Sequence, residues 1–256
     1  MTIGTRKTHE FCWINLMTTE AAHAKAFYAK LFGWTYGEMP GVTGGHLIEV
    51  KGRAAGALMD LATAKMPPGT PAVIGALVKV EDVDATMAKL TSLGGRGEAF
   101  DAMDNGRLAV CTDPNGATFG LWQPKTKPGF DVDSRAHGAP TWFETITTDL
   151  PRAVAFYTAL FGWRAEDQHP VPGMTYTLFK LGAEPVAGAM AIQPRMEGAT
   201  PHWGTSFAVD DADATVKLAG ELGATICMPV HEIPSVGRFA VVQSPQGVVF
   251  SVMQWS

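Results

Sequence analysis

The spacing of apolar and polar residues changes between two periods along the first quarter of the chain. Residues 9–18 alternate residue by residue, which predicts a half-buried strand. Farther along, Phe27 and Leu31 lie one helical turn apart, as on the buried face of an amphipathic helix. Strand-like runs then follow at 45–51 and 54–61. This order predicts a helix placed between strands, with its apolar side against a sheet.

The following segment repeats this order of elements. A strand is predicted at 72–80 and a helix at 83–92. Two further strands are predicted at 107–112 and 117–123, and the Asp-Pro-Asn-Gly sequence between them is typical of a tight turn. Each segment therefore fits a βαβββ module.

The whole pattern then occurs a second time. The sequence WINLMTTEAAHAKAFYAKLFGW at 13–34 is matched without a gap by WFETITTDLPRAVAFYTALFGW at 142–163. Two further pairs of segments match in the same way: 79–95 with 208–224, and 113–123 with 244–254. Repeats of this length indicate duplicated domains, so the chain is predicted to hold four βαβββ modules in an α+β fold.

Short polar motifs mark where the predicted helices begin and end. Asp149 followed by Pro151 is typical of a helix start, and glycine at Gly33 and Gly162 is typical of a helix end. Two acidic pairs are interpreted as further helix starts: Glu81-Asp82 and Asp210-Asp211.

The length of 256 residues fits two domains of about 120 residues, each large enough for its own core. The segment near residue 130 is polar, rich in Pro and Gly, and without a period, which is typical of a linker. We therefore predict a first domain at 1–123, a linker at 124–137 and a second domain at 138–256.

Composition and charge exclude several partners. A net charge of −5 without a run of Lys or Arg argues against nucleic acid. We find neither a signal-peptide pattern nor an apolar stretch of membrane-spanning length, so no membrane association is expected. Three scattered cysteines fit reduced, mostly buried thiols. A cytoplasmic protein is the expectation.

Three motifs together carry a family resemblance. They are the segment ending in AFYxxLFGW, the V-x-D-x-D helix start, and the D-P-x-G-x-x-F hairpin of the first half. In this order they resemble the vicinal oxygen chelate superfamily, which includes glyoxalase I, extradiol dioxygenases, and bleomycin- and fosfomycin-resistance proteins. The resemblance implies modules paired into two glyoxalase-like domains. In each, curved sheets would enclose a cleft for a divalent metal, a ligand, or both.

The positions of the family's metal ligands can be counted in this sequence. Counting back from the acidic helix starts places Trp13 and Trp142 at the first ligand position. The resemblance puts the other positions at Gly75 and Gly204, and at Gly120 and Ser251. Metals of this kind need imidazole, carboxylate or amide oxygen ligands. Neither half is therefore predicted to hold the family's metal, and no cofactor is expected.

A shift of two residues keeps the same strand face and changes what the second half offers. It brings in Glu144 and His202, a carboxylate and an imidazole that could form two-thirds of a metal-binding triad. Alternatively, they line a ligand cleft, form a hydrogen-bonded pair, or lie at the surface. Both are the candidate catalytic residues, because a buried Glu144 could exchange protons with a nearby histidine.

The inward-facing residues of the predicted strands define two candidate ligand clefts. The ligand-binding candidates are Trp13, Asn15, Met17 and Trp122 in the first cleft, and Trp142, Glu144, His202, Ser251 and Met253 in the second. Tryptophan facing glycine makes a flat slot for a small molecule. The alternative is that the tryptophans fill the vacated metal cavity.

Two functions follow from this site. The first is a small-molecule-binding protein without the usual metal ligands, of the drug-, metabolite- or resistance-binding type. Its ligand would be aromatic or amine-bearing, since Glu144 lies beside Trp142. The alternative is a glyoxalase- or dioxygenase-like enzyme with a rebuilt or metal-free site. The sequence predicts neither the pairing of the modules nor the oligomeric state.

Two arginines occupy equivalent places in the two halves. Arg107 and Arg238 both follow a glycine at the start of a predicted strand. A guanidinium group could bind a carboxylate or phosphate ligand at this place. A salt bridge near the turn is the favoured interpretation.

Overall fold

The computed structural model describes residues 6–64, 70–169, 173–194, 196 and 198–256. The first half contains, in chain order, β1 (Phe11–Thr18), α1 (Ala21–Phe32), β2 (Thr35–Glu38), β3 (Gly45–Val50), β4 (Arg53–Asp60), β5 (Val73–Lys79), α2 (Val83–Ser92), β6 (Arg96–Asp101), β7 (Gly106–Thr112) and β8 (Thr118–Pro124). The predicted βαβββ order is confirmed in both of its modules.

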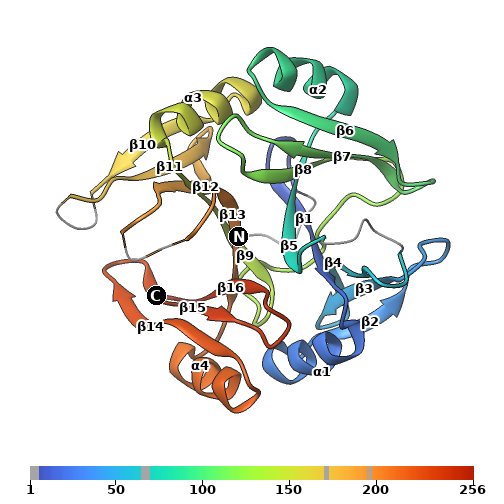
Figure 1. Cartoon of the computed structure of the whole chain (residues 1–256), viewed down its shortest axis with the longest axis vertical. Coiled ribbons are helices and arrows are strands. Elements are labelled where there is room, and N and C mark those ends of the chain that lie inside the picture. The colour runs from blue at the N-terminus through green and yellow to red at the C-terminus, as the bar shows by residue number, and fades with distance from the viewer. Residues whose placement is uncertain (1–5, 65–69, 170–172, 195, 197) are drawn as a thin grey trace.

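The second half repeats these elements one by one. They are β9 (Pro140–Thr147), α3 (Leu150–Phe161), β10 (Arg164–Gln168), β11 (Tyr176–Leu181), β12 (Glu184–Ala191), β13 (His202–Ala208), α4 (Ala212–Glu221), β14 (Thr225–Ile233), β15 (Gly237–Gln243) and β16 (Val249–Trp255). The predicted α+β fold of four repeated modules is confirmed, and Figure 1 shows the two halves with their helices at the periphery.

Two consecutive modules share each sheet. The strand order is β2-β3-β4-β1-β5-β8-β7-β6 in the first half and β10-β11-β12-β9-β13-β16-β15-β14 in the second. In both sheets the first strands of the two modules run antiparallel at the centre, β1 against β5 and β9 against β13. The module pairing that the sequence left open is therefore within each half.

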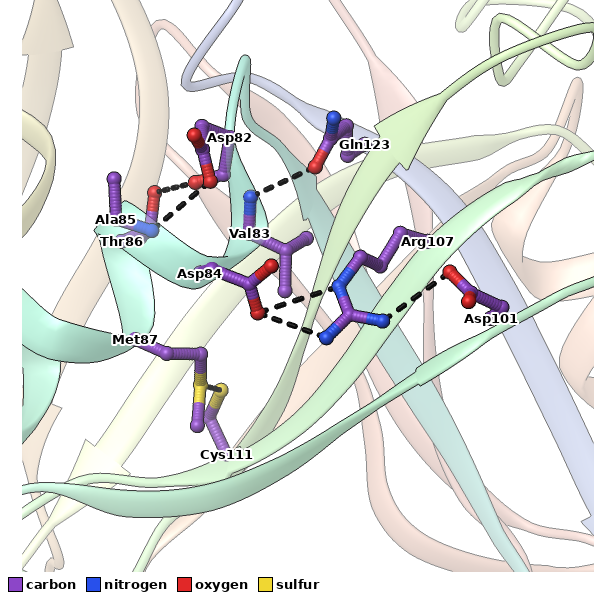
Figure 2. A network of polar contacts seen from close by, with 10 residues as sticks. All are labelled: Asp82, Val83, Asp84, Ala85, Thr86, Met87, Asp101, Arg107, Cys111 and Gln123. Atoms are coloured by element: carbon purple, nitrogen blue, oxygen red, sulfur yellow. Dashed lines mark hydrogen bonds and ion pairs between the residues drawn. The ribbon is translucent and has the colours of Figure 1, made fainter.

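The helices begin and end largely as their sequence motifs predict. Asp149 caps α3 by accepting a hydrogen bond from the backbone N–H of Arg152. Asp82 and Asp211 cap α2 and α4 in the same way, and Figure 2 shows the Asp82 cap. Glu20 precedes α1 but makes no side-chain cap. The first helix therefore starts without the cap that stabilises the other three.

Arg107 ties α2 to the sheet beside it. Its guanidinium group donates to Asp84 of α2 at 2.8 Å and to Asp101 of β6 at 3.2 Å (Figure 2). In the second half, Arg238 pairs with Asp213 of α4. The salt-bridge interpretation is confirmed for both arginines. Because these ion pairs are largely exposed, each contributes at most about 1 kcal/mol to stability.

The core extends from one half into the other. Helices α1 and α4 lie side by side, as do α2 and α3 (Figure 1). The Nε1 atom of Trp34 donates to the carbonyl oxygen of Gly138 at 2.8 Å, and that of Trp163 donates to His9 at 2.9 Å. Each repeated tryptophan after a helix therefore bonds the opposite half.

A buried polar network reinforces this contact. The hydroxyl group of Tyr157 lies 3.0 Å from a carboxylate oxygen of Asp113 in the other half. It also accepts a hydrogen bond of 2.8 Å from the Nε1 atom of Trp203. Burial raises the pKa of Tyr157 well above its ordinary value, so the hydroxyl keeps its proton and donates it to Asp113.

The segment predicted as a linker contributes to the core. Phe130 and Val132 are buried, and the backbone N–H of Phe130 donates to the carbonyl oxygen of Cys12. The Phe130 ring stacks between those of Trp13 and Phe143. The connection is thus ordered between the two sheets.

Two of the three free cysteines, Cys12 and Cys111, are buried, and Cys227 is exposed. Within the described residues, no helix has the length and apolar character needed to cross a membrane.

Candidate functional site

Each sheet has one face packed in the core and one face with half-buried side chains, which we name the open face. On β1, Ile14 and Leu16 are fully buried, whereas the alternate residues Trp13, Asn15 and Met17 are partly exposed. Strand pairing extends the open face of the first half across β5 and β8. Its cross-strand pairs are Asn15 with Gly75, Trp13 with Leu77, Leu77 with Gly120, and Lys79 with Trp122.

The open face of the second half is built in the same way. Trp142 lies opposite Ser206, Glu144 opposite Gly204, and Ile146 opposite His202. Ser206 continues the row to Ser251. The candidates on β16 are less accessible than those on β9, because Ser251 and Met253 are both buried.

Three side chains on the second open face form a hydrogen-bonded chain. The Nε1 atom of Trp142 donates to the hydroxyl oxygen of Tyr176 at 2.8 Å. The Tyr176 hydroxyl in turn donates to Oε2 of Glu144 at 3.1 Å. Within the described residues this hydroxyl is the only hydrogen-bond donor to Glu144. Its Oε1 atom is therefore left for another donor.

Tyr176 is a site residue that the sequence analysis did not identify. It comes from β11 and reaches over Gly188 of β12, where any Cβ atom would overlap its hydroxyl group. In the equivalent places of the first half, the strand register puts Gly45 and Ala57. Tyr176 over Gly188 in the second half thus corresponds to Gly45 and Ala57 in the first half.

The surroundings shift the pKa values of this chain of residues. Burial raises the pKa of Glu144, because the charged carboxylate loses solvation, and the hydrogen bond from Tyr176 partly opposes the shift. Burial raises the pKa of Tyr176 well above its ordinary value, and the neighbouring Glu144 adds to the effect. Tyr176 is therefore a neutral donor, and Glu144 exchanges its proton closer to neutral pH than an exposed glutamate.

His202 lies on the same face, but its hydrogen bond is to a backbone carbonyl group and not to Glu144. Its Nδ1 atom is 2.7 Å from the carbonyl oxygen of Thr200, so Nδ1 carries the proton and donates it. Within the described residues, no hydrogen bond joins His202 to Glu144. The structure thus brings Glu144 together with Trp142 and Tyr176, and places His202 farther along the strand pair.

The first open face has a different polar arrangement. The Nε1 atom of Trp13 donates to Oδ1 of Asn15 at 3.2 Å, and that of Trp122 donates to the carbonyl oxygen of Lys127 at 2.9 Å. Both rings, like that of Trp142, are partly exposed, whereas Trp34, Trp163 and Trp203 are buried. The open-face tryptophans thus leave part of their surface to solvent.

Two grooves on the described part of the chain lie away from both open faces. One, of about 530 Å³, runs between the end of α1 and the start of α4, and is lined by Lys30, His137 and Asp210 among others. The second, of about 290 Å³, lies beside α1 near Pro245.

The residues present do not fit the metal that the fold family implies. The positions counted for the family ligands carry tryptophan, glycine and serine. Glu144 and His202 stand at none of these positions and belong to different cross-strand pairs, Glu144 with Gly204 and His202 with Ile146. Within the part of the chain that the structure describes, no three His, Cys, Asp or Glu side chains come close enough to hold a metal ion.

Paired βαβββ modules with a site on the open face define a glyoxalase-like protein. The sequence profile of the Glyoxalase/Bleomycin resistance protein/Dioxygenase superfamily matches residues 140–252, and a glyoxalase-like domain profile matches residues 13–122. The chain belongs to this superfamily.

Two relatives match nearly the whole chain. A protein of Mycobacterium tuberculosis named "Putative glyoxylase CFP32" is 39% identical over 94% of this chain and 93% of its own length. The anthracycline biosynthesis protein DnrV of Streptomyces peucetius is 32% identical over 94% of this chain and 92% of its own length. Both alignments therefore extend over the two halves of this chain.

Solved structures share the fold at low identity. The Mn(II)-bound glyoxalase from Novosphingobium aromaticivorans has a TM-score of 0.67 and 16% identity, covering 97% of this chain and 82% of that chain. The 2,3-dioxygenase LapB from Pseudomonas has a TM-score of 0.65 and 13% identity, covering 99% and 93%.

Glu144→Gln is expected to make the protein more stable at pH 8. The raised pKa of Glu144 means that the folded state holds the proton more tightly than the unfolded chain. Stability from this group is present below the unfolded-state pKa of about 4.3 and is lost as the pH rises through the folded-state value. Glutamine removes the titration and still offers an oxygen to Tyr176.

Urea denaturation of both proteins between pH 4 and pH 8 measures this difference. The gain in the free energy of unfolding should shrink as the pH falls and vanish near pH 4. A wild type more stable than the variant at pH 8 would contradict the burial of an uncompensated carboxylate.

Proposed function

We propose that this chain binds a small aromatic molecule on the open face of its second half, without a resident metal. The carrying observation is the chain of hydrogen bonds from Trp142 through Tyr176 to Glu144. It holds an aromatic ring and a carboxylate together on a partly exposed surface. Small-molecule sites commonly combine apolar walls with a few fixed polar groups.

The missing metal ligands support this choice over metal chemistry. Trp142 stands at the first ligand position that the family resemblance assigns, and Glu144 is already hydrogen-bonded by Tyr176. The names of the relatives, one for a glyoxylase and one for anthracycline biosynthesis, both concern small molecules. The free cysteines and the acidic net charge agree with a cytoplasmic protein that has no nucleic-acid partner.

Elemental analysis combined with tryptophan fluorescence tests this function. Protein purified without chelators should hold less than stoichiometric Mn, Fe, Ni or Zn. Aromatic compounds should change the fluorescence of the wild type but much less that of Trp142→Phe, with Trp34→Phe as the matched control in the core. A stoichiometric metal that Glu144→Ala releases would overturn the proposal.

A second candidate is proton transfer by Glu144. The raised pKa of this carboxyl group is the observation that favours it, because a general base works best near the operating pH. Carboxylate Oε1 would take a proton from the hydroxyl-bearing carbon next to a substrate carbonyl and return it to the former carbonyl carbon. The hydroxyl proton would move to the carbonyl oxygen in the same isomerisation, so that no co-reactant is consumed. Deuterium exchange into 2-hydroxycarbonyl compounds, abolished in Glu144→Gln, would establish this activity.

A further inference from the structure

The two open faces differ at three matched positions. The second half has Glu144, Tyr176 and Gly188 where the first half has Asn15, Gly45 and Ala57, as the strand register shows. In the first half the tryptophan donates to Asn15, a neutral amide. In the second it donates to Tyr176, which frees Glu144 from any contact with the indole nitrogen. The halves therefore present different chemistry to a ligand.

Glu144 has one carboxylate oxygen that a ligand could bind and one side from which a ligand could approach. Oε2 accepts the Tyr176 hydroxyl, and Oε1 has no hydrogen-bond partner among the described residues. Across the strand pair lies Gly204, where even an added Cβ would stay 3.8 Å from Cγ of Glu144. The glycine therefore leaves only a methyl-sized space beside the Glu144 side chain, and a ligand group reaches the carboxylate from the solvent side, where Glu144 is partly exposed.

Glu144 has no cationic partner among the residues that the structure describes. Within the described residues, no Lys or Arg forms an ion pair with Glu144. Lys180 of β11, in the same sheet, pairs with Glu166 of β10 at 2.6 Å. A partly desolvated carboxylate favours a positive charge, and binding a cation favours its ionised form. The aromatic face of Trp142 attracts a cation as well.

We propose that the open face of the second half selects a flat aromatic amine, whose ammonium group meets Oε1 of Glu144, and that Tyr176 is the positioning residue for this selectivity. The first half, with Asn15 in place of the carboxylate, has no such preference. The inference rests on the proposed function, because it names the ligand class of the same site. Tyr176 acts through Glu144 and Trp142 by holding both in place.

Fluorine NMR of protein labelled with 5-fluorotryptophan tests this selectivity residue by residue. The chain has 7 tryptophans, so Trp142→Phe, Trp13→Phe and Trp122→Phe assign the three open-face signals. Three probes share one ring system: 2-naphthylmethylamine, 2-naphthalenemethanol and 2-naphthoate. The amine should shift the Trp142 signal at concentrations at least about tenfold lower than the alcohol, as a charged hydrogen bond allows. The carboxylate probe should bind most weakly.

Two variants and a matched control locate the effect. Glu144→Gln should reduce the amine-to-alcohol preference to about one, while Glu98→Gln, at an exposed carboxylate on β6 of the first half, should leave it unchanged. Tyr176→Phe keeps the ring but loses the hydroxyl. It should lower the preference several-fold and leave the affinity for the alcohol within about twofold, which a general loss of structure would not do.

The outcomes separate this inference from the proposed function. If the three probes shift the Trp142 signal equally, or if Glu144→Gln keeps the preference, the selectivity is overturned while binding on the open face stands. If Tyr176→Phe keeps the preference, the positioning role is overturned. If no probe shifts the Trp142 signal, both the proposed function and the selectivity fail.

Discussion

Replacing Trp163 with alanine is expected to lower the free energy of unfolding by about 3–5 kcal/mol, the range for deleting a buried aromatic side chain. Its ring is 3% exposed and lies 4.8 Å from that of Phe161 and 5.2 Å from that of Phe179. The change would also leave the carbonyl oxygen of His9 without its donor. The hydrogen bond to His9 and a ring contact with Phe11 at 6.2 Å join Trp163 to the first half.

Because the core is shared, this loss should be felt by both halves together. Circular dichroism during urea denaturation should show one transition in the wild type and one, at lower urea, in Trp163→Ala. Trp122→Ala is the matched control, because its partly exposed ring contributes less to the core. Two separate transitions in the variant, with one half unaffected, would contradict a core that couples the halves.

Gly188→Ala is expected to remove amine selectivity while the fold survives. The added methyl group would occupy the place of the Tyr176 hydroxyl, and this hydroxyl is the end of a side chain that can turn away. Both hydrogen bonds of Tyr176 would then be lost. Glu144 would no longer be held in place for its charge-assisted hydrogen bond to the ammonium group. We therefore expect the affinity for 2-naphthylmethylamine to fall by about tenfold or more.

The fluorine signal of Trp142 measures this loss directly, together with thermal denaturation. Gly220→Ala in α4 is the matched control, because a Cβ there meets no atom within 4 Å. The control should bind the amine normally and should be slightly more stable, since alanine favours a helix. Normal amine binding by Gly188→Ala would show that amine binding does not require the Tyr176 hydroxyl at its position over Gly188.

The sequence was most informative where side chains meet the core. The alternation in β1 and the caps at Asp82, Asp149 and Asp211 follow from local chemistry, and the structure confirms them. The sequence analysis assigned no residue ranges to the edge strands. All residues of β10 and most of β6 are exposed, so neither strand has the apolar alternation that burial imposes.

Tyr176, the key residue of the candidate site, was not predicted from the sequence for a different reason. Trp142 and Glu144 lie two positions apart on one strand, so their shared face is visible in the sequence. Tyr176 comes from a strand that reaches them only across β12, and its counterpart Gly45 is nothing like a tyrosine. Such a contact requires the register of three strands, which the spacing of residues does not supply.

The contact between the halves was also not predicted. Trp34 and Trp163 follow the helix-ending glycines, and the repeat gives each only a local role. Their hydrogen bonds to Gly138 and His9 depend on how two separate sheets pack. The duplication indicated two domains, and the structure adds that buried residues of both halves form one hydrophobic cluster.

The central claim is that the second open face binds its ligand without a metal, and one measurement tests it most directly. The dissociation constant of 2-naphthylmethylamine is determined before and after exhaustive chelation, and again after Mn(II) or Zn(II) is added back. The account predicts the same value within about twofold throughout, because Trp142, Tyr176 and Glu144 form the site by themselves. Loss of binding on chelation, restored by either metal, would contradict it.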